Sequence, residues 1–123
     1  MTRAIILFAH GARDPSWAQP FEAVAERVQA LQPQARVRLA FLEFMRPTLT
    51  EAGDELAQDG ATEVQVVPMF LGAGGHVRRD LPALLEDLRQ RHPSVRWGLR
   101  PAIGEAASVV EAMAREVATA EAS

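Results

Sequence analysis

Residues 3–9 read Arg-Ala-Ile-Ile-Leu-Phe-Ala and run directly into His10-Gly11, and this stretch decides the fold. A short apolar run that stops at a glycine is typical of a buried strand. The run is too short for a helix of ordinary length, so the chain is predicted to begin with a strand.

Similar apolar runs alternate along the chain with longer segments of helical period. The further predicted strands cover residues 36–43, 63–68 and 95–99. The predicted helices begin at Trp17 after a cap at Asp14 or Ser16, at Pro47, after a cap at Asp80, and after a cap at Ser108. In the last of these helices, Val110, Met113 and Val117 are expected to face inward. Strands joined by helices of this length run parallel, with right-handed crossovers. We therefore expect an α/β fold with an open, doubly wound parallel four-stranded sheet in the order 2-1-3-4, flanked by helices.

Composition bounds the possible functions. The 123 residues predict one domain, 1–123, that is 48% hydrophobic and carries a net charge of −3. That charge disfavours nucleic acid or an anionic membrane as a partner, since both attract basic proteins. The chain has no cysteine, which excludes thiolate chemistry. No apolar run reaches the length of a membrane span or a signal peptide, so a cytoplasmic location is expected.

Chemistry-bearing residues gather at one predicted edge of the sheet. Ligands of doubly wound sheets bind beyond the carboxyl ends of the strands, where the strand order reverses. His10 ends the first strand, Glu43 ends the second, and His76 lies in the loop after the third. Two of the three histidines thus fall at this edge, whereas His92 ends a helix at the opposite edge and is interpreted as structural.

This trio suits a divalent transition metal. Imidazole and carboxylate ligands with open positions fit ferrous, cobaltous or nickel ions, whereas an all-oxygen magnesium or calcium site needs no histidine. Simpler roles stay open: a structural hydrogen bond for His10, a solvated loop position for His76, and a surface ion pair for Glu43. The spacing is not a local metal motif, so it does not decide between them.

The glycine-rich loop and the arginines of this edge have two interpretations each. Residues 69–77 form either a lid over a flat ligand or a merely flexible connection, with Gly74 and Gly75 near its end. Arginines on the edge loops can bind carboxylates through paired N–H groups. All thirteen basic residues are arginine, however, so no single arginine is strong evidence; the edge set comprises Arg13, Arg46, Arg78 and Arg79.

Three segments together resemble a known family. LFAHGARDP (7–15), AFLEFMRPTL (40–49) and VVPMFLGAGGHVRRDLP (66–82) are similar to the sirohydrochlorin chelatases of the CbiX/SirB type, in their small single-domain form. The resemblance implies half of a class II chelatase fold, with the metal bound by His10 and His76 and with Glu43 at the site. Ala12 stands where the family usually has serine.

The resemblance also implies an activity. The chain is expected to be a lyase that inserts cobalt, iron or nickel into sirohydrochlorin, an acidic tetrapyrrole, for cobalamin or siroheme biosynthesis. The divalent metal is its substrate, no organic cofactor is expected, and short members of the family imply a homodimer. Glu43 or a histidine is the expected proton acceptor. The expected substrate-binding residues are Arg13, Arg46, Gly74, Gly75 and Arg78.

Two alternatives remain. A histidine phosphatase also has a strand that ends in His-Gly, but the preceding residue here is Ala9, where that motif needs arginine. A module that carries a metal or a tetrapyrrole without converting it needs the same histidines and the same edge, so the sequence does not exclude it.

Overall fold

The computed structural model describes residues 2–72 and 74–122, apart from the side chain of His76. Its four strands form one parallel sheet in the order β2-β1-β3-β4, which confirms the predicted fold class and strand order. No helix of these residues is both long and apolar enough to cross a membrane. The elements are β1 (Arg3–Ala9), η1 (Pro15–Ala18), α1 (Gln19–Leu31), β2 (Arg36–Phe41), α2 (Leu49–Gln58), β3 (Glu63–Pro68), α3 (Gly75–Arg91), β4 (Arg96–Leu99), η2 (Ile103–Glu105) and α4 (Ala107–Ala118).

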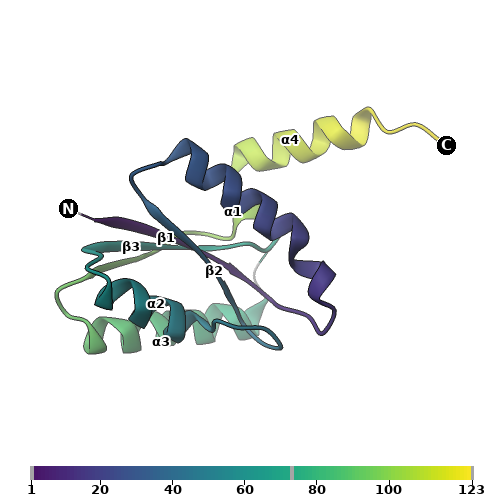
Figure 1. Cartoon of the computed structure of the whole chain (residues 1–123). Coiled ribbons are helices and arrows are strands. Elements are labelled where there is room, and N and C mark those ends of the chain that lie inside the picture. Colours follow the sequence, from purple (N-terminus) through teal and green to yellow (C-terminus); the bar gives the residue numbers. More distant parts are fainter. Residues whose placement is uncertain (1, 73, 123) are drawn as a thin grey trace.

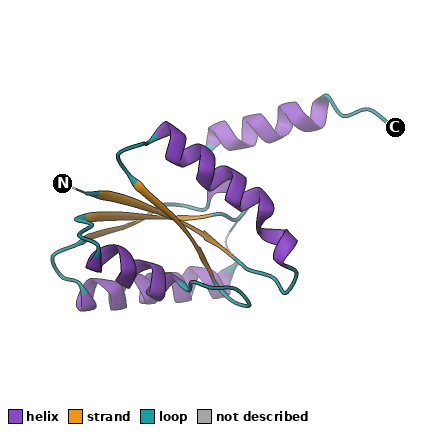
Figure 2. Cartoon of the chain, in the orientation of Figure 1, coloured by secondary structure: helices purple, strands orange, loops and turns teal. Residues whose placement is uncertain are grey.

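The helices form a layer on each face of the sheet (Figures 1 and 2). Helices α2 and α3 lie side by side on one face, and α1 crosses the other. Helix α4 extends away from the sheet on the side of α1 (Figure 1). From β1 the chain moves to β2 on one side and later to β3 on the other, so the strand order reverses at β1.

Strand β1 is the centre of the core. Ile6 and Phe8 are 0% and 1% exposed and pack with the apolar residues of α2 and α3, among them Leu56 and Leu88. On the opposite face, Ala9 packs with residues of η1, α1 and β2. Burial on both faces is what the continuous apolar run predicted.

The second strand ends at Phe41, two residues before the predicted end at Glu43. The chain still follows β1, because the N–H groups of Leu42 and Glu43 donate to the carbonyls of Ala9 and His10 at 2.9 and 3.0 Å. Phe44 then takes a left-handed backbone conformation with φ 67°, which turns the chain away from the sheet.

Helix α2 begins with a capping box. The hydroxyl of Thr48 accepts the N–H of Glu51, and the carboxylate of Glu51 accepts the N–H of Thr48. The cap is therefore Thr48, and Pro47 stands just before the helix rather than opening it. Arg46 also pairs with Glu51, and these hydrogen bonds lower the pKa of Glu51 to about 2.

Two predicted helix starts are wrong. Helix α3 begins at Gly75 with Gly74 as its N-cap, so Asp80 lies inside the helix and does not cap it. Burial explains the earlier start, because Val77 and Leu81 are 8% and 5% exposed and extend the apolar stripe towards the helix N-terminus. Helix α4 begins at Ala107 without a side-chain cap, so Ser108 is helical as well.

The predicted inward face of α4 is exposed. Val110, Met113 and Val117 are 50%, 37% and 74% exposed, which contradicts the expectation that they point inward. The reason is geometric: α1 already covers this face of the sheet, and α4 packs near η2 instead. Amphipathic spacing gives a helix an apolar stripe, but it does not say which surface covers that stripe.

Glu51→Gln should reduce stability in a pH-dependent way. Glutamine preserves the capping-box hydrogen bond but removes the charge that Arg46 stabilises. The pKa of Glu51 is lower in the folded state, about 2 against an ordinary 4.5. The charge therefore stabilises the fold above about pH 4.5, and this contribution is lost as the pH falls towards 2.

Urea denaturation at a series of pH values measures this effect. The parent should be more stable than Glu51→Gln at neutral pH, and the difference should vanish on acidification. Glu26→Gln, at an exposed position of α1, is the control and should show no such trend. A difference for Glu51→Gln that is constant with pH contradicts the ion-pair explanation.

Candidate metal centre

His10 is the first residue after β1 and lies exposed at the reversal point of the strand order. Its ring packs against the ring of Phe70, with centroids 4.3 Å apart and planes inclined by 33°. Phe70 is only 5% exposed and comes from the segment between β3 and α3. A buried aromatic ring thus supports an accessible imidazole, which restricts its orientation without covering it.

The backbone of Glu43 lies directly beside His10. The N–H of Glu43 donates to the carbonyl of His10 at 3.0 Å. Gly11 makes this approach possible: its φ is +89°, and a Cβ there would lie 1.9 Å from the carbonyl oxygen of Glu43. The structure therefore brings the two predicted residues together. A glycine directly after the strand is visible in the sequence, but its contact with the loop of Glu43 becomes visible only in the structure.

His76 is the second residue of α3, not a loop residue as expected. Its backbone lies at the carboxyl edge of the sheet, because α3 starts shortly after β3 ends. Its side chain is outside the described part of the structure. Across the side chains that are described, no three of His, Asp or Glu gather closely enough to hold a metal ion. Whether His10, Glu43 and His76 form one centre thus stays a prediction.

The segment that carries Phe70 is fastened by η2. The N–H of Gly104 donates to the carbonyl of Phe70 at 2.9 Å. A Cβ at Gly104 would lie 2.1 Å from the carbonyl oxygen of Leu71, so only glycine fits there. This contact joins η2 to the segment whose Phe70 packs against the ring of His10. No sequence signal separates the buried Gly104 from the other glycines of the chain, so this contact could not be predicted from the sequence.

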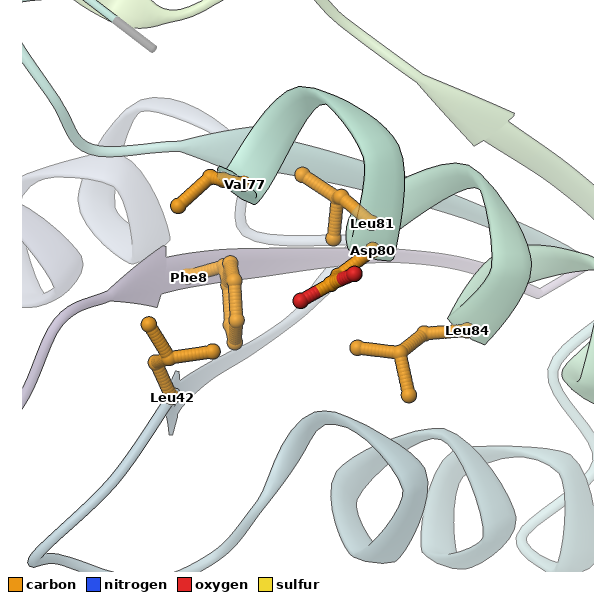
Figure 3. Close-up of a pocket in the computed structure, with 6 residues that line it drawn as sticks. All are labelled: Phe8, Leu42, Val77, Asp80, Leu81 and Leu84. Carbon is orange, nitrogen blue, oxygen red and sulfur yellow. The ribbon is translucent and has the colours of Figure 1, made fainter. Parts of the chain in front are cut away.

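The first turns of α3 pack against apolar side chains of β1 and of the loop after β2 (Figure 3). Phe8 and Leu42 come from below, and the helix supplies apolar residues and Asp80 around a gap of about 10 Å³, room for about one water molecule. The carboxylate of Asp80 points into this gap (Figure 3). The close fit fixes the start of α3, and hence the backbone of His76, relative to β1; the helix residues are Val77, Asp80, Leu81 and Leu84.

The arginines of this edge differ in whether they already contact other side chains of the protein. The guanidinium of Arg13 lies 4.9 Å from the ring centroid of Phe44, a cation–π distance. Arg46 is held in its ion pair with Glu51, whose hydrogen bond raises the pKa of Arg46. Arg78 and Arg79 are exposed residues of α3. Arg46 is therefore the least available of the predicted substrate-binding arginines.

Exposed apolar side chains flank His10. Phe44 follows β2 and is 59% exposed, and Leu71 follows β3 and is 73% exposed. His10 follows β1, which lies between those strands. The edge thus presents a histidine between two apolar groups, together with exposed arginines. A flat, apolar ligand with acidic substituents fits this pattern better than a small polar one.

Taken together, these observations define a doubly wound α/β domain with an accessible, supported histidine at the reversal point of its strand order. The CbiX family model matches residues 4–120. The chain belongs to the CbiX family, which confirms the resemblance noted in its sequence and places it apart from the histidine phosphatases.

Solved structures and relatives agree with this assignment. The structure of a cobalamin biosynthesis CbiX protein from Marinobacter aquaeolei has a TM-score of 0.82 and 34% identity, covering 94% of each chain. SirB from Bacillus subtilis with Fe³⁺ has a TM-score of 0.80 and 28% identity, covering 98% of this chain and 49% of SirB. The sirohydrochlorin cobaltochelatase of Methanopyrus kandleri is 38% identical over 82 residues, 67% of this chain and 57% of that protein. The chain therefore matches little more than half the length of that relative.

Gly104→Ala should destabilise the protein by roughly 1–3 kcal/mol, because the new methyl group overlaps the backbone of Leu71. Urea denaturation measures the loss. Gly72→Ala is the matched control in the same segment: a Cβ there meets nothing within 4 Å, so its effect should stay within about 0.5 kcal/mol. Equal losses in the two variants contradict a specific contact between η2 and the segment.

Proposed function

We propose that this chain is a sirohydrochlorin chelatase that inserts a divalent metal into the macrocycle. The observation that carries the proposal is the accessible imidazole of His10, supported by Phe70 and beside Glu43, at the reversal point of a CbiX-family sheet. Relatives named as cobaltochelatase, and SirB structures with iron and cobalt, support a metal as substrate.

In this proposal the metal is bound weakly and passed on. His10, with His76, holds the ion through neutral imidazoles. Because the protein supplies only a few ligands and leaves coordination positions free, the ion can be passed on readily. As the ion forms bonds to the macrocycle nitrogens, the pyrrole N–H protons must leave. Glu43, whose loop runs beside His10, accepts these protons one at a time as a general base and passes each on to water before the next.

The macrocycle lies across the exposed apolar groups of the edge. Phe44 and Leu71 contact its faces, while Arg13 and Arg78 meet its acidic substituents. Gly74 and Gly75 set the start of α3 beside it, without side chains that would block access. No organic cofactor takes part, and the reaction belongs to cobalamin or siroheme biosynthesis in the cytoplasm, without nucleic acid or membrane as a partner.

A second copy of the chain completes the cleft. SirB contains about twice the length matched here, so one chain corresponds to half of it. One half offers a macrocycle a single wall. The exposed apolar face of α4 (Val110, Met113, Val117) has no cover within the described chain and suits a self-association surface. We therefore propose a homodimer.

Chelatase activity is tested by following the visible spectrum of sirohydrochlorin anaerobically with cobaltous, ferrous or nickel ions. The parent should accelerate insertion, and His10→Ala and His76→Ala should each lose at least about tenfold, since losing even an outer-shell partner of a metal ligand costs that much. His92→Gln is the matched control, because His92 bonds Asp54 on α2 at 2.7 Å, far from this edge, and should retain activity. Macrocycle binding without insertion by the folded parent favours the carrier alternative.

The homodimer is tested by light scattering at micromolar concentration. The parent should show twice the chain mass, and Met113→Glu with Val117→Glu should yield a monomer, because charge on the apolar face opposes its burial. Ala112→Glu places the same charge at another exposed position of α4 and should leave the dimer intact. A monomeric parent refutes the proposal.

A further inference from the structure

A second candidate binding feature lies beside the metal centre, between α3 and the segment after β4. It is a groove of about 180 Å³, open at the carboxyl ends of β3 and β4. One wall is formed by α3 and the other by the segment from Leu99 to η2. Its central residues are Arg78, Leu81, Leu99, Arg100, Pro101 and Glu105.

The charges of the groove favour an anion. Arg78 and Arg100 face it from opposite walls, and within the described part of the chain neither forms an ion pair. Glu105 is the only carboxylate among the lining residues. The backbone of Arg100 is fixed, because its N–H donates to the carbonyl of Val66 at 2.9 Å. The two guanidinium groups thus leave the groove with a net positive charge.

The remaining lining is apolar. Leu81, Leu99 and Pro101 provide contacts for methylene groups between the two arginines. A ligand that fits has a carboxylate at the end of a short aliphatic arm. A phosphate would use the arginines but not the apolar lining, and a wholly apolar ligand would leave the arginines without a partner.

The groove is close enough to the candidate metal centre for one ligand to reach both. Strand β4 is two strands from β1, so the groove lies roughly 10 Å from the line of His10 across the sheet. That separation is comparable with the reach of a macrocycle from its centre to the end of a carboxylate side arm. A tetrapyrrole centred at His10 therefore places one peripheral arm at the groove.

We propose that this groove binds one peripheral carboxylate arm of the tetrapyrrole, with Arg100 as the specificity-determining residue. Arg78 assists from α3, and Glu105 opposes binding by charge repulsion. The inference rests on the proposed function, since it takes the macrocycle to be centred at His10. It identifies a residue, Arg100, that lies outside the three segments shared with the chelatases in sequence.

The test measures binding without metal, so that it does not depend on catalysis. Sirohydrochlorin and its fully esterified form are titrated in the same mild detergent, and the macrocycle absorbance or fluorescence reports the dissociation constant. The variants are Arg100→Gln, Glu105→Gln and Arg96→Gln. Arg96 is the matched control, because it lies at the other end of β4 and lines a groove at the opposite edge together with Arg89.

The expected pattern has a sign for each variant. Arg100→Gln should weaken binding of the acid roughly three- to tenfold, the loss of one charge-assisted hydrogen bond partly exposed to water, and should leave the ester unaffected. Glu105→Gln should tighten binding of the acid. Arg96→Gln should change neither ligand.

Other patterns decide against the proposal. Equal effects of Arg100→Gln and Arg96→Gln mean that only the overall charge matters and overturn the groove assignment. An equal loss for acid and ester does so as well. If the parent binds with the expected pattern but inserts no metal, the proposed chelatase fails while the groove stands. A parent that binds no sirohydrochlorin refutes both.

Discussion

The positions of all other elements depend on the burial of β1. This strand is hydrogen-bonded on both edges, to β2 and β3, and covered on both faces. The chain leaves this strand to one side and later returns to its other side, and the right-handedness of these crossovers places the helices on opposite faces of the sheet. The same constraint places the residue after β1 where the order reverses. The position of His10 is thus a consequence of the core.

The candidate metal centre around His10 combines a rigid base with an open edge. Phe70 supports the imidazole from a buried position, and a hydrogen bond from η2 holds the segment that contains Phe70. Packing against Phe8 and Leu42 fixes the start of α3. Above this base lie exposed apolar and arginine side chains. Rigidity below and access above fit the proposed function, in which the site orients a metal and then releases it to a large second substrate.

The sequence predicted those features that follow from local pattern and topology. Apolar runs gave the strands, and their parallel order brought His10 beside the loop of Glu43. The start of α3 was missed because its glycines oppose helix formation locally, whereas the burial of Val77 overrides them. Gly104 was missed because its role is a contact with a backbone distant in sequence. The exposure of α4 could not be predicted, because amphipathic spacing shows that a helix has an apolar stripe but not which surface packs against it.

Arginine content says little in this chain, since arginine is its only strongly basic residue type, but the arrangement of the guanidinium groups is informative. Several arginines are neutralised by carboxylates of the same chain, as in the pairs Arg36–Asp59 and Arg91–Asp54. Arg46, although at the edge of the metal centre, is also neutralised. Arg78 and Arg100 instead converge on one groove from different elements. The two guanidinium groups outnumber the single carboxylate of the groove, Glu105, so the groove keeps a positive charge that favours an anion. This convergence, rather than the number of arginines, distinguishes a recognition surface from an ordinarily charged one.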